Sequence, residues 1–207
     1  MILEKSSLTI ALLGDWNKLY IQPEWMAKNV YVEEKIEITV NGQGTDYNVS
    51  YRGRDILIAP TQNKILFSAL NMDNSTIIDL VQCINRFLQK ATTPILSAYG
   101  FNCEFYEENS SRFAEVVDGV LDNNAIIANG YEIKATTITR TLVKDEKVLN
   151  LESSLEGNKT KLHFNEHYGQ PQAIMPNIEI QQIENFILAA QDLVKAFGYD
   201  LEEEDNE

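Results

Sequence analysis

Hydrophobic residues recur at every second position through much of the first third of the chain. Ile36, Ile38 and Val40 alternate with charged or polar residues, and the alternation resumes after an N-G-Q-G sequence at 41–44. A two-residue period is typical of a strand with one buried face, and glycine and asparagine tolerate the positive φ angles of hairpin turns. The segment from Val30 to Leu70 therefore predicts an antiparallel meander of strands.

Two later segments change to a helical period. The first apolar stripe follows the capping residue Asp73 and consists of Ile77, Val81, Ile84 and Leu88. The second stripe consists of Ile183, Ile187, Ala190, Val194 and Phe197, and Gly198 follows it. Spacings of three and four residues place each stripe on one face of a helix. We therefore predict amphipathic helices over about 75–90 and 178–197.

The segment from Thr92 to Phe105 joins the first helix to a strand that we expect inside the sheet. Pro94 cannot continue a helix, so the helix must end just before it. Gly100 indicates a close approach or a bulge, and Phe101, Cys103 and Phe105 then alternate with polar residues. We assign structural roles to Pro94, Gly100 and Asn102, and we expect the Asn102 amide to hydrogen-bond a neighbouring loop.

The second half has the same order of elements as the first. Strand patterns cover 131–143, 147–155 and 161–165, and the second predicted helix follows them. We therefore expect an α+β fold, a twisted antiparallel sheet covered on one face by two long helices, with duplication of a strands-then-helix unit. The predicted domain covers 1–199, with pseudo-halves at about 8–107 and 110–199, and an acidic disordered tail covers 200–207.

Two sequence motifs resemble those of a family of uncharacterised bacterial proteins. The segment T-P-I-L-S-A-Y-G-F-N at 93–102 is similar to a T-P-I, three residues, G-x-N motif. The segment at 14–29, G-D-W-N-K-L-Y-I-Q-P-E-W-M-A-K-N, is similar to the family's pattern of glycine, aromatic residue, Asn and then P-x-W-x-A. Many members have a His before the proline, where this chain has Thr93. The resemblance implies no activity, because none is established for the family.

The charge balance disfavours direct binding of nucleic acid. Acidic residues outnumber basic ones by 31 to 17, for a net charge of −14, and eight of these charges lie outside the predicted tail. Affinity for a phosphate backbone depends largely on Lys and Arg, so a surface of this sign repels nucleic acid. The chain has two cysteines and no C-x-x-C pair, and it shows neither a signal-peptide pattern nor a membrane-length apolar run. We expect a cytoplasmic protein that does not bind membranes.

Among candidate sites, His163, Glu166 and His167 form an H-x-x-E-H string that matches an inverted zinc-protease motif. That chemistry requires a helix, in which residues four apart share a face. The alternation of Leu162 and Phe164 with polar residues instead predicts a strand, so we assign no metal and no cofactor.

Trp16, Tyr20 and Trp25 form an aromatic segment with two interpretations. The three rings either pack in the core or form a recognition surface for a partner, and the sequence does not separate these two alternatives.

The leading hypothesis is a non-catalytic interaction protein, or an accessory module of a bacterial complex. It would engage a protein partner, or a second copy of itself, through a sheet edge, the aromatic segment or the acidic tail. An alternative is an acidic inhibitor that imitates nucleic acid and occupies a DNA-binding protein. A metal-dependent hydrolase centred on the two histidines is the least favoured hypothesis.

Overall fold

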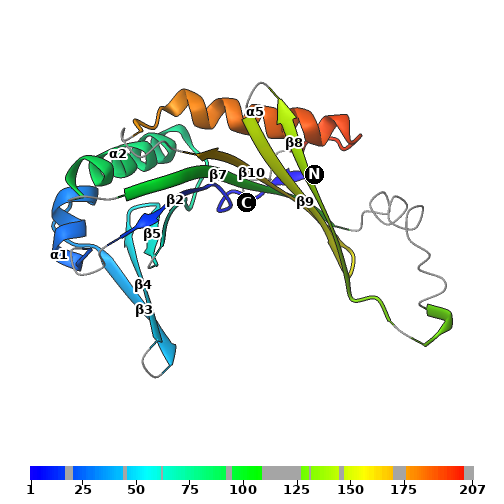
Figure 1. Cartoon of the computed structure of the whole chain (residues 1–207), viewed down its shortest axis with the longest axis horizontal. Coiled ribbons are helices and arrows are strands. Elements are labelled where there is room, and N and C mark those ends of the chain that lie inside the picture. The colour runs from blue at the N-terminus through cyan, green and yellow to red at the C-terminus, as the bar shows by residue number, and fades with distance from the viewer. Residues whose placement is uncertain are drawn as a thin grey trace.

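The computed structural model contains one antiparallel sheet of ten strands, with two helices on one side of it (Figure 1). The structure describes residues 1–16, 21–43, 46–61, 63–91, 95–108, 127–130, 132–144, 147–169 and 176–202. The strand order is β3-β4-β5-β6-β2-β7-β10-β9-β8, and β1 pairs with β7 off this path.

The elements follow the chain in this order: β1 (Ile2–Leu3), β2 (Thr9–Asp15), α1 (Pro23–Met26), the π-helix η1 (Ala27–Tyr31), β3 (Glu37–Gln43), β4 (Asp46–Gly53), β5 (Ile56–Pro60), β6 (Lys64–Ala69), α2 (Asn74–Lys90), β7 (Ile95–Glu108), β8 (Ala135–Lys144), β9 (Lys147–Glu156), β10 (Lys159–Gly169) and α5 (Ile180–Ala196).

The strand β7 is the centre of the sheet. It pairs with β2 on one side and with β10 on the other, and all of these pairings are antiparallel. The predicted alternation is confirmed, because Phe101, Cys103 and Phe105 are fully buried whereas Asn102 and Glu104 are only partly buried. A strand with neighbours on both sides and one fully buried face fixes the register of everything paired to it.

Both arms of the sheet return to this centre in the same way. The meander β3–β6 ends with β6 paired to β2, and the meander β8–β10 ends with β10 paired to β7. The strand β7 therefore joins the two arms, since it pairs with β2 of the first and with β10 of the second.

The helix α2 begins at the N-cap Asp73, whose side chain accepts a hydrogen bond from the backbone N–H of Thr76, 2.8 Å away. Its buried face packs on β5 and β6. The helix α5 begins with a reciprocal pair of hydrogen bonds between Glu179 and Gln182 and packs on β7 and β10. Asn85 of α2 joins the two helical regions, since its amide nitrogen donates to the backbone oxygen of Ile178, 2.8 Å away.

The predicted fold class, an α+β fold with one sheet face covered by two long helices, is wrong. Helices occur at the two predicted positions, but the molecule is mainly a ten-stranded sheet. Two helices side by side cover about 20 Å, whereas ten strands spaced by about 4.8 Å span more than 40 Å. Figure 1 shows β3–β4 and much of β8–β9 extending past the helices. Neither β3 nor β8 contains a buried residue in the described part of the chain.

The first three residues of the predicted acidic tail, 200–202, contact the N-terminus or the core. The backbone nitrogen of Met1 contacts the backbone oxygen of Asp200, and the N–H of Glu202 donates to the Met1 oxygen over 3.0 Å. Leu201 packs against the core. Residues 203–207 lie outside the described part of the chain. Among the helices that the structure describes, none has the length and apolar character needed to span a membrane.

Candidate functional site

The strand β8 forms one free edge of the sheet. It pairs with β9 along its whole length, from Ala135 opposite Glu156 to Lys144 opposite Lys147, and no described strand pairs with its other side. Four of its ten residues are threonines, and Val143 is 71% exposed. An edge strand presents a row of unpaired backbone N–H and C=O groups, which can pair with an extended segment of another chain.

A cavity of about 470 Å³ lies between the β8–β9 hairpin and α5. Its apolar walls are Leu142, Leu149, Ala189 and Leu193, and its charged lining groups are Lys144, Lys147, Glu166 and Asp192. Figure 1 shows the end of the hairpin rising towards α5. The helix α5 packs on β7 and β10, and the cavity lies beside these contacts.

Glu166 is the buried charge of this cavity, with only 4% of its surface exposed. The Lys147 ammonium lies 3.1 Å from its Oε1, and the Tyr168 hydroxyl donates a short hydrogen bond to the same oxygen. Burial raises the pKa of Tyr168, and the adjacent carboxylate raises it further, so the phenol stays a donor. The Tyr168 ring stacks on Tyr99, with centroids 4.8 Å apart, which fixes its position.

The opposite face of the sheet carries a row of amide side chains. Asn165 donates to Asn102 over 2.8 Å, Asn150 donates to Asn165 over 3.2 Å, and Asn102 donates to the backbone oxygen of Thr9 over 3.3 Å. Thr141 extends the row to β8, at 2.9 Å from Asn150. The amide of Asn102 thus bonds neighbouring strands, and the expectation that it bonds a loop is wrong.

Gly100 lies next to this row of amide side chains, close to Asn165. A Cβ atom at this position would lie 2.9 Å from the backbone oxygen of Glu166 and 3.3 Å from the Asn165 amide nitrogen. Gly100 therefore permits the close approach that the sequence indicated. Pro94, the third residue given a structural role, lies outside the described residues.

The two histidines lie on a strand, as predicted, so the helix that the zinc motif needs is absent from this segment. His163 and His167 share the open face of β10, while Glu166 points to the face that α5 covers. Three candidate ligands spread over both faces of a sheet cannot hold one ion. The described residues contain no other group of three metal-ligating side chains close enough to do so.

Two of the three residues of the aromatic segment pack against the core. Trp16 is 4% exposed, and its ring centroid lies 5.4 Å from that of Phe87. Trp25 is partly buried, and it meets Phe87 edge-on at 6.0 Å. These contacts favour core packing over a recognition surface. Tyr20 lies outside the described residues.

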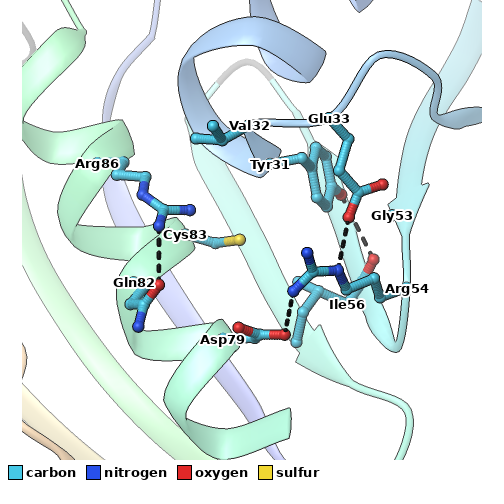
Figure 2. Close-up of a pocket in the computed structure, with 10 residues that line it drawn as sticks. All are labelled: Tyr31, Val32, Glu33, Gly53, Arg54, Ile56, Asp79, Gln82, Cys83 and Arg86. Carbon is cyan, nitrogen blue, oxygen red and sulfur yellow. Dashed lines mark hydrogen bonds and ion pairs between the residues drawn. The ribbon is translucent and has the colours of Figure 1, made fainter. Parts of the chain in front are cut away.

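A second pocket, of about 230 Å³, lies where α2, the end of η1 and the β4–β5 turn meet (Figure 2). Side chains of α2, including Cys83 and Arg86, face Tyr31 and the β4–β5 turn. Tyr31 packs on Gly53, where a Cβ atom would lie 2.5 Å from its ring, and its hydroxyl donates to the Tyr51 backbone oxygen over 2.7 Å. Burial raises the pKa of Cys83 to about 12, so its thiol is not a nucleophile at neutral pH.

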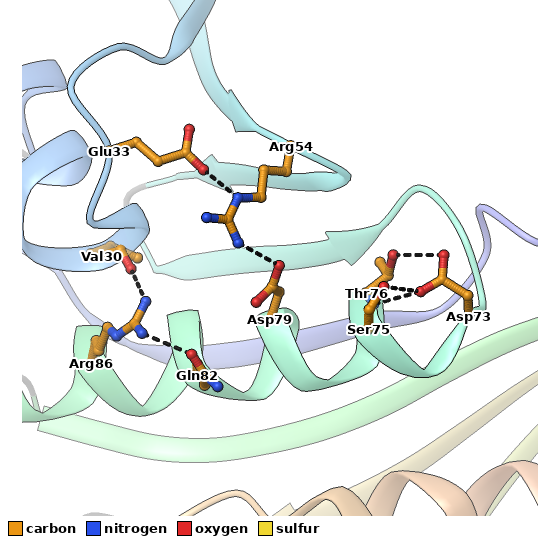
Figure 3. A network of polar contacts seen from close by, with 9 residues as sticks. All are labelled: Val30, Glu33, Arg54, Asp73, Ser75, Thr76, Asp79, Gln82 and Arg86. Atoms are coloured by element: carbon orange, nitrogen blue, oxygen red, sulfur yellow. Dashed lines mark hydrogen bonds and ion pairs between the residues drawn. The ribbon is translucent and has the colours of Figure 1, made fainter.

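The charged groups of this second pocket are already paired (Figure 3). Arg54 binds Glu33 and Asp79, at 3.0 Å and 2.9 Å. Arg86 donates to the backbone oxygen of Val30 over 3.2 Å and to Gln82 over 2.7 Å. These contacts join the turn, the η1 segment and α2, so they stabilise the packing of these three elements.

In the sequence, Glu166 stands out only as a possible metal ligand, and its contacts with Lys147 and Tyr168 are not evident there. One signal was present, because Glu166 continues the alternation of Leu162 and Phe164 one residue beyond the strand predicted at 161–165. A carboxylate in the apolar phase of a strand is buried and needs a partner, since burying an unpaired charge is costly. The partner itself was not identifiable, because Lys147 lies on a different strand.

The comparisons with known proteins give no family for the chain. No protein-family profile and no curated protein matches it. Among solved structures, the chain is similar to the rolling circle replication initiator protein from Geobacillus stearothermophilus, with 7% sequence identity and a TM-score of 0.32. The match covers 93% of this chain and 84% of that one. A likeness at this TM-score carries no argument about fold or function.

Proposed function

We propose that the protein is a non-catalytic interaction module that adds an extended segment of a protein partner to its sheet at β8. The free edge of β8 is the observation that carries this proposal. A strand of ten residues offers about 33 Å of backbone for pairing. Strand addition of this kind takes its affinity from main-chain hydrogen bonds.

The length of β8 favours this edge over that of β3. Natural edge strands are commonly short, or interrupted by proline or a bulge. The strand β8 has ten residues, whereas β3 has seven. We place the interaction in the cytoplasm, because both cysteines are free and buried.

The alternative of an acidic nucleic-acid mimic receives less support from the described ion pairs. Arg54 occupies Glu33 and Asp79, and Lys161 lies 3.6 Å from Glu104. Carboxylates already paired within the molecule offer less charge to the cations of a DNA-binding partner.

Site-specific photocrosslinking in living cells tests the proposal. A benzoylphenylalanine replaces Thr139, an exposed residue near the middle of β8, and in a matched control it replaces Gln181, an exposed residue of α5. We expect a discrete protein adduct from position 139 and none from 181. The crosslink should map to an extended segment of the partner, or to β8 of a second copy.

Hydrogen exchange on the recovered complex provides the second measurement. Backbone amides on the free side of β8 should exchange more slowly in the complex than in the isolated protein, because pairing protects them. An adduct only at 181, or a complex without added protection in β8, would overturn the proposal.

A further inference from the structure

The cavity beneath α5 has the size and the lining of a small-molecule site. Such sites are clefts of about 300–1,000 Å³ with mainly apolar walls and a few placed polar groups. The cavity here has a volume of about 470 Å³, its walls include Leu142, Leu149 and Leu193, and Glu166 supplies a buried carboxylate.

The carboxylate of Glu166 can accept further hydrogen bonds. Both of its polar contacts with described residues, from Lys147 and from Tyr168, are made by Oε1. An ionised carboxylate has about four lone-pair positions on its two oxygens. A ligand that carries N–H donors can therefore bind Oε2 without displacing Tyr168.

Lys147 is a replaceable counter-ion. Its side chain is 57% exposed, and it occupies the first position of β9, beside the hairpin turn. Because this ammonium is already largely in water, it can leave the carboxylate when another cation takes its place. Glu166, at 4% exposed, has no comparable access to solvent. The buried member of the pair is fixed while the exposed member exchanges.

We propose that this cavity binds a small organic amine, with its apolar body between α5 and the β8–β9 hairpin and its ammonium paired with Glu166. A carboxylic acid of the same shape is disfavoured, because it brings a second negative charge next to a buried one. A neutral analogue keeps the apolar contacts and loses the ion pair. This proposal concerns the cavity only and does not depend on strand addition at β8.

Three ligands with one apolar body test the proposal by titration calorimetry on the full chain. They are phenethylamine, 2-phenylethanol and 3-phenylpropionate. We expect the amine to bind at least about tenfold more tightly than the alcohol, and the acid to bind most weakly.

Two substitutions should change the affinity for the amine in opposite directions. Glu166→Gln keeps an acceptor for Tyr168 and should remove the preference for the amine, so that amine and alcohol bind alike. Lys147→Ala removes the competing cation and should tighten the amine. Lys134→Ala is the matched control, since Lys134 is 77% exposed and is not among the residues that line the cavity. It should leave the affinity unchanged.

Two results would overturn the proposal. One is tightest binding by 3-phenylpropionate, which would mean that Lys144 and Lys147 of the cavity recognise an anion. The other is the absence of measurable binding by any of the three ligands to either the parent chain or Lys147→Ala. The second result does not depend on Glu166→Gln folding, because binding is measured on the parent chain as well as on Lys147→Ala.

Discussion

The centre of the sheet, β7, and its β8 edge are both long strands, of 14 and 10 residues, but they differ in what covers them. In the middle of β7, Phe101, Cys103 and Phe105 are fully buried on one face, and Phe101 contacts Phe186 of α5. In β8 no described side chain is buried, and Leu142 is among its least exposed. Hydrophobic burial stabilises the first region, whereas pairing to β9 on one side holds the second. The comparison shows how one sheet can combine a stable interior with an edge that remains available to a partner.

The largest expected effect on stability comes from truncating a buried side chain at the centre of the sheet. Phe101→Ala removes a fully buried ring that contacts Tyr99, Tyr168 and Phe186. Such a truncation costs about 3–5 kcal/mol in the free energy of unfolding. Urea denaturation followed by circular dichroism measures it.

Val143→Ala on β8 is the control for that truncation. Val143 is 71% exposed, so its loss should change the free energy of unfolding by less than about 0.5 kcal/mol. Equal costs for the two variants would contradict the contrast between centre and edge, because they would place buried contacts on β8.

A smaller effect comes from adding one methyl group between β7 and β10. Gly100→Ala places a Cβ 2.9 Å from the Glu166 backbone oxygen and pushes against Asn165, so the two strands must separate or the amide row must break. Overpacking of this kind costs about 1–3 kcal/mol. Gly169→Ala is the matched control, since a Cβ there meets nothing within 4 Å. Thermal unfolding of both variants should show a lower midpoint for Gly100→Ala alone.

Gly100 also illustrates how much of the fold follows from the sequence. The alternation of Phe101, Cys103 and Phe105 identified β7 as a strand with one buried face, and the helical stripes identified α2 and α5. Local periodicity specifies an element and its buried face. It does not specify how many strands join a sheet, so the ten-stranded width and the bare outer strands were not predicted.

The candidate site was less predictable than the fold. A free edge is defined by which strand lacks a neighbour, and the cavity by the distance of α5 from the β8–β9 hairpin. Both depend on pairings between residues far apart in the chain. The histidine motif was correctly placed on a strand because its neighbours alternate. The pairing of Asp79 with Arg54, in contrast, joins α2 to a turn 25 residues earlier, and no local pattern indicates it.

The smallest expected effect concerns Arg54, at the periphery of the α2 side. This residue has a φ angle of 50°, in the left-handed region, and its side chain is 64% exposed. Arg54→Gly and Arg54→Ala lose the same two ion pairs, to Glu33 and Asp79. Glycine adopts positive φ without the steric cost that a Cβ imposes. We therefore expect the glycine variant to unfold at a higher temperature than the alanine variant, although alanine is usually the more stable of the two.

Added sodium chloride should narrow the difference in unfolding temperature between the parent chain and Arg54→Gly, because salt screens exposed charges. It should leave the gap between the two variants unchanged, because backbone sterics do not depend on ionic strength. A large, salt-independent loss in both variants would contradict this account, since Arg54 would then hold the α2 region through packing, as residues of the sheet centre do.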